Sequence, residues 1–386
     1  GLNRSDYELV DGVRQQINEI TAYIDASNVY GSDEERAFAL RLRDGSGRLA
    51  TSEGELLPLN TQGLANAPTS FDPSFFLAGD VRANEQIGLT AMHTVFVREH
   101  NRLARRIAQR QPHWDGERIY QEARALVAAE IQIVTYEEWL PLLLGRRALP
   151  KYRGYDPGHD ATIANVFSTA AFRFGHSMLN ERVLRLDRHG REIAAGHLLL
   201  KRSFFAPEEI VNNGIAPVLR GLSRQRAQRL DSQITDAVRN FLFGEPGAGG
   251  FDLAALNIQR GRDHGLPSYN EARAYLGLAT AADFADITAD PAAQARLAAV
   301  YPSPDAVDLW VGGLAEDRVP GALIGELFYE ILREQFTALM VGDRFFYRRS
   351  LNSFQKRMMG NVSLAAIIRR NTEIGPELHR DIFHVQ

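Results

Sequence analysis

Thr169-Ala-Ala-Phe-Arg-Phe-Gly-His176 is the stretch on which the fold and the function of this sequence depend. It is an apolar run, predicted to belong to a helix from about Ile163 to Leu179, and it ends in a histidine directly after a glycine. A lone histidine in such a run is often a core residue bonded to the backbone. Gly175, however, removes a side chain beside the ring, which lets something large and flat approach the backbone.

A second segment, about eighty residues further on, offers partners for that histidine: Asn257-Ile-Gln-Arg260-Gly-Arg262-Asp263-His264-Gly265. The Asn257 amide can accept a hydrogen bond from the far N–H of the ring, and the arginines can hold carboxylates. A histidine that ligates a metal normally has such a partner, which fixes its tautomer. The hypothesis from these two segments is that His176 is the axial ligand of a haem iron.

Length and composition are those of an ordinary globular protein. The chain has 386 residues, of which 45% are hydrophobic and 24% charged, and its formal net charge is −4. That charge gives no sign of a nucleic-acid partner. The absence of cysteine excludes disulfides, thiolate haem ligation and cysteine-based zinc sites. No apolar run approaches the length of a membrane span.

An oxygen-rich stretch near the start of the chain is a candidate cation site. Hydroxyl, carbonyl and carboxylate oxygens alternate along it, and an extended backbone would turn alternate residues the same way. Oxygen ligands of this kind suit Ca²⁺, but the stretch taken alone favours an Asp/Ser-rich turn before a helix, and a calcium site would need a further carboxylate from another segment. The candidate ligands are Thr21, Tyr23, Asp25 and Ser27.

Hydrophobic periodicity predicts a mainly α protein, a single large helical domain over residues 1–386 with a few short strands. The clearest helices are expected at about 87–109, 115–139, 223–243, 291–300 and 324–340. A hairpin is expected at 47–59, and the first twenty residues are predicted to be weakly helical.

Arg82 and Glu85 lie three residues apart at the entry to the helix 87–109, so one turn of chain can point both inward. A salt bridge at the start of the helix is the simpler interpretation. His93 and His100 lie seven apart on that helix. We expect them to join a packed polar network rather than a metal site, because two ligands on one helix are better placed three or four residues apart.

Together these segments resemble the animal-type haem peroxidases, a family of the peroxidase–cyclooxygenase superfamily, in its myeloperoxidase-, lactoperoxidase- and peroxidasin-like branch. The similarity covers nearly the whole chain and keeps the order of several independent motifs. These motifs are Tyr23 to Ser32, Phe76 to Arg82, Met92 to Leu103, Phe172 to His176, Leu256 to Pro267, Trp310 to Leu314 and Gly342 to Phe346.

The resemblance implies a role for each matching residue. His176 would be the proximal iron ligand of haem b, and Asn257 the partner of its ring N–H. Arg82 would be the catalytic distal arginine that polarises the peroxide, and Glu85 would form an ester with the haem. Arg173 and Arg260 would hold the propionates. Thr21, Tyr23, Asp25 and Ser27 would form the calcium loop.

The sequence departs from the family pattern at two places. Gln86 stands where some relatives have a methionine that bonds a haem vinyl, so no sulfonium link is expected. The family's distal-histidine helix, expected before residue 20, is not present in the sequence. That helix supplies the catalytic base, so we expect a separate N-terminal segment or light chain to carry it.

The resemblance therefore implies a secreted haem peroxidase that uses hydrogen peroxide to oxidise halides, thiocyanate or small aromatic donors. If the distal helix is truly absent, the alternative is a haem-binding pseudo-enzyme or an adhesion or matrix module on a peroxidase fold. A fatty-acid dioxygenase of the same superfamily is a third possibility. Those enzymes place a radical-forming tyrosine three residues before the proximal histidine, where this chain has Arg173.

Overall fold

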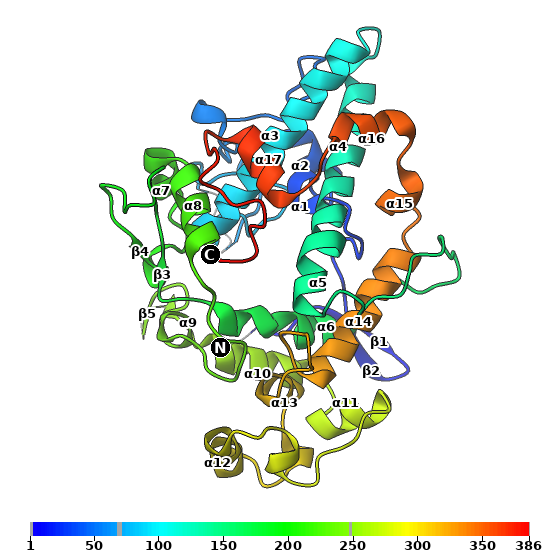
Figure 1. Ribbon diagram of the computed structural model, residues 1–386, viewed down its shortest axis with the longest axis vertical. Helices are drawn as coiled ribbons and strands as arrows, with labels where there is room; N and C mark the ends of the chain where they lie inside the picture. Colours follow the sequence, from blue (N-terminus) through cyan, green and yellow to red (C-terminus); the bar gives the residue numbers. More distant parts are fainter. Residues whose placement is uncertain (1–2, 68–71, 247–248, 386) are drawn as a thin grey trace. The chain divides into compact units, whose positions relative to one another are not determined.

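Helices α3 (Ile87–Arg110) and α4 (Gly116–Ile133) lie side by side and are the longest elements of the fold (Figure 1). The computed structural model describes residues 3–67, 72–246 and 249–385. The chain divides into two compact units. Unit 1 comprises Gly1–Ala22, Trp139–Glu181 and Ala227–Arg344, and unit 2 comprises Tyr23–Glu138, Arg182–Arg226 and Phe345–Gln386.

Unit 2 is built around the buried face of α3. Gln86 caps the N-terminus of this helix, because its side-chain oxygen accepts from the backbone N–H of Gly88 at 2.6 Å. The other helices of unit 2 are α1 (Ser27–Tyr30), α2 (Glu34–Ala39), η1 (Glu53–Glu55), η4 (Leu200–Arg202), α7 (Pro207–Asn213), α8 (Ala216–Arg224), α15 (Tyr347–Ser350), α16 (Ser353–Met359) and α17 (Leu364–Asn371). Two short antiparallel strands, β3 (Arg182–Val183) and β4 (Leu198–Leu199), pair with each other.

Unit 1 is a set of shorter helices that pack on α14 (Glu326–Val341) and α13 (Leu309–Ala315). A Cβ on Gly312 would lie 2.3 Å from the Tyr269 ring, so the close approach of α13 requires glycine there. The remaining elements are β1 (Tyr7–Val10), β2 (Val13–Gln16), α5 (Leu140–Leu143), α6 (Asn165–Thr169), η3 (Ala171–Met178), α9 (Asp236–Arg239), β5 (Glu245–Pro246), β6 (Gly249–Gly250), α10 (Leu253–Asp263), α11 (Tyr269–Tyr275), η5 (Phe284–Asp286), α12 (Pro291–Val300) and η6 (Pro304–Ala306).

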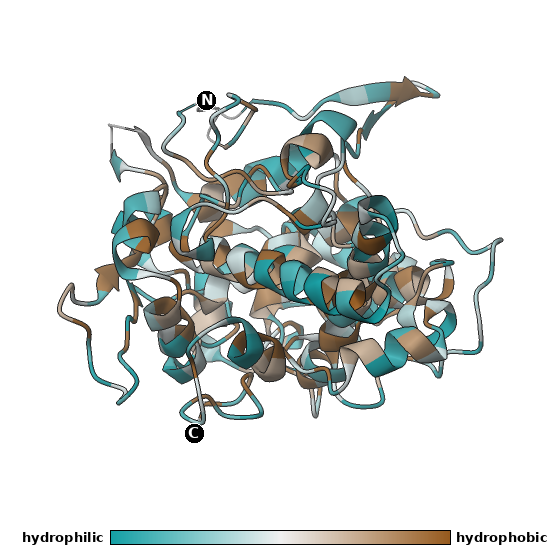
Figure 2. Cartoon of the chain, turned by 90° about the horizontal axis from the view of Figure 1, so that it is seen from above, coloured by the Kyte–Doolittle hydropathy of each residue, from teal (hydrophilic) through white to brown (hydrophobic). Residues whose placement is uncertain are grey.

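The predicted class is confirmed, since the chain is mainly helical with a few short strands. Hydrophilic and hydrophobic residues alternate on the same helices, as packing of one helix face against a core requires (Figure 2). The helix predicted at 291–300 has those bounds, and the one predicted at 87–109 ends one residue later. Within the described ranges, no helix combines the length and the apolar character needed to cross a membrane.

Several local predictions were wrong. Residues 7–16 form a hairpin rather than a helix, because Asp11-Gly12 adopts positive φ values of 52° and 79° and makes the tight turn. Residues 53–55 form a 3-10 turn instead of a hairpin tip, and Leu49 pairs with Arg41. Of the helix predicted at 223–243, only the last two residues of α8, which ends at Arg224, and the short helix Asp236–Arg239 are helical.

The helix predicted at 115–139 differs from the observed structure near its C-terminal end. Its α-helical part stops at Ile133, a π-helical turn covers Val134–Trp139, and α5 then continues through Pro141. Proline is tolerated there because it occupies the first turn of a new helix, where its missing N–H leaves no hydrogen bond broken.

Candidate functional site

The segment that carries His176 is a short α-helix followed by a 3-10 helix, not the continuous helix predicted at 163–179. The helix is interrupted at Ala170, whose φ of −129° and ψ of −69° separate α6 from η3. A 3-10 helix has three residues per turn, so residues three apart lie on the same face. Ala171, Phe174 and Ser177 form the buried face. Arg173 and His176 therefore share another face.

His176 is held through one ring nitrogen. Its Nδ1 lies 2.8 Å from Nδ2 of Asn257, a residue of α10 that is buried. Asp252 caps α10 by accepting from the backbone N–H of Ala255, which fixes the start of the helix one turn before Asn257. The structure thus brings together the two segments that the sequence singled out.

Arg173 completes this group by bonding the other end of the amide. Its Nη1 donates to Oδ1 of Asn257 at 3.1 Å, and its Nε donates to the backbone carbonyl of Ser168. Arg173, Asn257 and His176 therefore form a chain of hydrogen bonds in which the amide connects the guanidinium to the ring.

The second ring nitrogen of His176 is open. Among the described residues, none forms a hydrogen bond with Nε2, and a Cβ added to Gly175 would meet no atom within 4 Å. Burial, with the nearby Arg173 charge, lowers the His176 pKa to about 4. The imidazole is therefore neutral near pH 7, which is the form that binds a metal.

Arg82 and Glu85 lie in unit 2, in the turns that lead into α3. They do not form the salt bridge considered from the sequence. The Arg82 guanidinium instead makes a two-pronged contact with Asp80, from Nε at 2.9 Å and from Nη2 at 2.7 Å. Burial raises the Glu85 pKa, and the neighbouring Arg82 charge lowers it by less. Asp80 was not singled out from the sequence, although it lies within the motif that ends at Arg82.

Arg260 lies one turn beyond Asn257 on α10, but its guanidinium is directed elsewhere. It donates to the backbone of Asn3, to the Ser5 hydroxyl and to Asp263. Next to it, His264 bonds Ser5 through Nε2 at 2.8 Å and Asn165 through Nδ1 at 2.8 Å. His264 thereby ties the end of α10 to α6, a positioning role that sequence reasoning missed although it had quoted the residue in the motif.

The two histidines of α3 are part of a polar network, as predicted. His100 is fully buried and bonds the Tyr30 hydroxyl through Nδ1 at 2.8 Å and the Gly47 carbonyl through Nε2 at 2.9 Å. His93 bonds the Asn28 carbonyl. Within the described part of the chain, no group of three or more histidine or acidic side chains is arranged to hold a metal ion.

The stretch predicted to bind calcium is bent rather than extended. Ala26 has a left-handed φ of 63°, and the Asp25 carboxylate accepts from the backbone N–H of Ser27 at 2.9 Å. Ser27 begins helix α1, Tyr23 lies in a bend before it, and Thr21 has no regular secondary structure. The stretch therefore has the Asx-type turn that was the alternative interpretation, and its role in binding calcium stays a prediction.

Comparison with known proteins independently supports the family resemblance of this sequence. A family model described as animal haem peroxidase matches residues 2–383. Human peroxidasin homolog is 42% identical over 96% of this chain, and mouse eosinophil peroxidase is 42% identical over 96%. Peroxinectin A of Dictyostelium discoideum is 40% identical over 93% of the chain. The chain spans 26% of the human peroxidasin, 55% of the eosinophil peroxidase and 67% of the peroxinectin.

Solved structures agree with the sequence comparison. Peroxidase A from Dictyostelium discoideum superposes with a TM-score of 0.90 at 38% identity, over 96% of this chain and 73% of that one. A fatty acid alpha-dioxygenase from Oryza sativa has a TM-score of 0.77 at 24% identity, over 93% of this chain and 64% of that one. The latter similarity is one of fold alone.

Proposed function

Because this chain belongs to the animal haem peroxidase family, we propose that it is the haem-binding part of a peroxidase. The enzyme would use hydrogen peroxide to oxidise small anions, such as halides or thiocyanate, or small aromatic donors. The observation that carries the proposal is His176, a neutral imidazole with Nδ1 held by Asn257 and Nε2 open beside Gly175. A ligand histidine needs these features, and a core histidine does not.

The residues around His176 fit haem b in a further respect. A histidine that binds iron through Nε2 carries its proton on Nδ1 and donates it. The Asn257 amide must then present Oδ1 to the ring, and its NH₂ group turns toward Arg173. Two donors would then face each other, so the hydrogen bond between Arg173 and Asn257 would be lost. We propose that Arg173 and Arg260 donate to the haem propionates, whose carboxylates suit planar guanidinium groups.

When bound, haem supplies the iron at which the peroxide O–O bond is cleaved. The protein has to hold the imidazole, exclude competing ligands and stabilise the negative charge that develops on the peroxide oxygen. We assign that stabilisation to Arg82, by its match to the family motif. Asp80 holds the Arg82 guanidinium in a fixed orientation, which preorganises the cation. Glu85, whose pKa is raised by burial, is the proposed carboxyl for an ester with haem.

The remaining parts of the proposal rest on the family resemblance. Thr21, Tyr23, Asp25 and Ser27 are the proposed calcium ligands, and oxygen atoms of this kind suit that ion. The protein is proposed to act outside the cell. The prediction that a separate segment carries the distal histidine stays a prediction.

Reconstitution with haem tests the proposal. The protein is expected to give a Soret band with haem b and, together with the segment that carries the distal histidine, to oxidise a phenolic dye in the presence of hydrogen peroxide. Replacing Arg82 by Ala should lower the peroxide-dependent rate by about 100-fold, because a preorganised charge is removed, and leave the Soret band in place. The control is Arg43→Ala, a change of an exposed arginine far from the motif in sequence.

Each outcome of this test is decisive for one part of the proposal. Failure of the purified protein to bind haem would overturn it altogether. Haem binding without any peroxide-dependent oxidation, in protein shown by intact mass to include the segment with the distal histidine, would favour the alternative of a haem-binding protein that is not an enzyme.

A further inference from the structure

An arginine-lined cavity opens on the surface of unit 2, between α3, α17 and the chain that follows α17. Its volume is about 320 Å³. Four arginines line it, three from one side of α3 and one from α17, and two glutamates lie at its edge. The residues are Arg98, Arg102, Arg105, Arg370, Glu55 and Glu373. None of them is part of the proposed haem site.

The arginines leave many N–H groups for a ligand. Arg105 makes no hydrogen bond within the described residues, and its only ionic partner there is Glu55 at 3.8 Å. Arg102 bonds Glu99 through Nε and Nη2, which leaves Nη1 without a described partner. Arg98 donates one N–H from each of its nitrogens to a backbone carbonyl, and no carboxylate in the described part of the chain contacts its guanidinium. The cavity therefore offers donors in several orientations.

Positive charge exceeds negative charge around the cavity. The Glu99 side chain is fully buried next to the cavity, and its carboxylate forms ion pairs with both Arg102 and Arg370. Burial beside Glu99 raises the pKa of Glu130, the other carboxyl that Arg370 contacts, which favours its neutral form.

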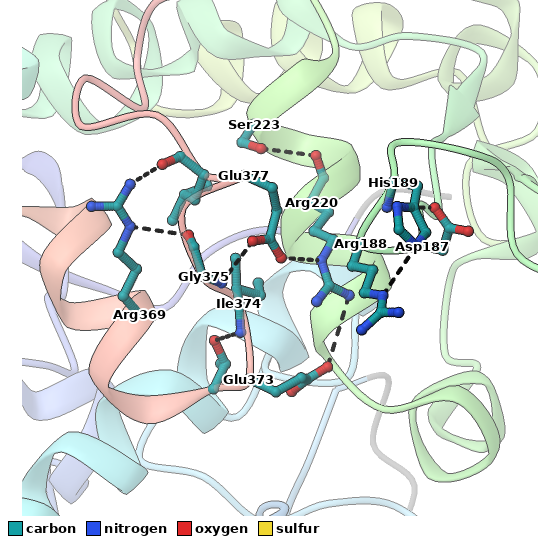
Figure 3. Close-up of polar contacts among 12 residues, drawn as sticks. Asp187, Arg188, His189, Arg220, Ser223, Arg369, Glu373, Ile374, Gly375 and Glu377 are labelled. Atoms are coloured by element: carbon teal, nitrogen blue, oxygen red, sulfur yellow. Dashed lines mark hydrogen bonds and ion pairs between the residues drawn. The ribbon is translucent and has the colours of Figure 1, made fainter.

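The Glu373 carboxylate also forms an ion pair with a cationic side chain that does not line the cavity. It faces Arg220 at 3.8 Å, and Arg220 contacts Glu377 as well (Figure 3). Next to the cavity on α3, the pKa of Arg106 is lowered by burial and by the like charges of Arg110, Arg102 and Arg370. The arginines of this part of α3 are therefore close enough for their like charges to act on Arg106.

We propose that this cavity is a binding site for a tetrahedral oxyanion, a phosphate or sulfate group, held by Arg98, Arg102 and Arg105. Planar guanidinium groups match the geometry of such oxygens, and donors on several arginines suit an oxyanion, which has several acceptor atoms, better than a halide. The group can be a free ion or part of an ester on a larger molecule.

Titration calorimetry of the haem-loaded protein tests the proposal, with inorganic phosphate as the probe and chloride used to keep ionic strength constant. Saturable phosphate binding is expected. Arg105→Ala should weaken it by about tenfold or more, because a charge-assisted contact is lost. Glu55→Gln should strengthen it, because the competing carboxylate is removed. Both positions are largely exposed, so the fold is expected to persist, as circular dichroism will show.

Arg110→Ala is the matched control, since Arg110 is an exposed arginine of the same helix that does not line the cavity. It should bind phosphate like the unchanged protein. Parallel titrations with O-phosphoserine and a sulfated disaccharide identify the source, since tighter binding of either one indicates an ester rather than a free ion. The proposal is overturned if none of the three probes binds saturably, or if Arg105→Ala and Arg110→Ala bind alike.

Discussion

His100 and His176 show how two histidines with similarly lowered pKa values can have opposite availability. Both pKa values are lowered to about 4, mainly by burial. His100 bonds through both ring nitrogens, to Tyr30 and to Gly47, inside the α3 core of unit 2. His176 bonds through Nδ1 alone, and the glycine before it leaves open space. A lowered pKa is therefore shared by a core histidine and by the proposed iron ligand, whereas the open Nε2 beside Gly175 distinguishes His176.

Local secondary structure explains this difference. α3 is a regular helix whose caps and buried face fix His100 among large side chains, including Tyr30 and Tyr120, whose rings lie 5.4 Å from the imidazole. The 3-10 helix η3 buries only every third residue and turns His176 away from that buried face. One histidine contributes to stability, and the other is available for binding.

Replacing each of the two histidines in turn is expected to give the largest effects. His176→Ala should weaken haem binding by more than about 100-fold, because the axial ligand is lost, and change the free energy of unfolding of the haem-free protein by less than about 1 kcal/mol. His100→Ala should cost about 3 kcal/mol, because it leaves a cavity and two unpaired polar groups, yet keep haem binding. Haem titration and urea unfolding measure the two quantities. Haem binding that survives in His176→Ala would contradict the comparison.

Buried His100 should contribute to a pH dependence of stability, together with His93, His176 and His264, whose pKa values are also lowered by burial. The pKa of His100 is lowered from an ordinary value of 6.5 to about 4, so the folded state favours the neutral ring. The stability from this group is present above pH 6.5 and is lost as pH falls toward 4, by up to about 3 kcal/mol.

Urea unfolding across this pH range checks the sign and the size. His100→Gln should reduce the slope between pH 6.5 and 4 by the contribution of this one histidine, and the other buried histidines should keep the rest. The contribution of Glu99, whose pKa is lowered to about 2, is lost at lower pH and does not overlap most of this window. An unchanged slope in His100→Gln would show that other groups are responsible.

A smaller effect is expected when the partner of His176 is removed. Asn257→Ala should weaken haem binding by about 10- to 100-fold, because the ring loses the group that fixes its orientation and tautomer. Asn270→Ala is a matched control, since Asn270 is a buried asparagine of the same unit that bonds the Ala281 backbone. Equal haem affinities in the two variants would show that Asn257 acts only through folding.

The sequence predicted the long helices and the partnership of His176 with Asn257, because strong periodicity and several spaced motifs carry that information. It did not predict the break at Ala170 or the 3-10 geometry that aligns Arg173 with His176, since both depend on packing against α14. The Asp11-Gly12 turn was recognisable from its residues and was missed. The contact of Arg82 with Asp80 depends on the conformation of the turn, which periodicity does not specify.

Resonance Raman spectroscopy of the ferrous, haem-loaded protein tests most directly whether His176 Nε2 binds the iron. A stretching band between iron and a histidine nitrogen should be present, should disappear in His176→Gly, and should return when free imidazole fills the space. A band that is unchanged in His176→Gly without added imidazole would contradict the assignment.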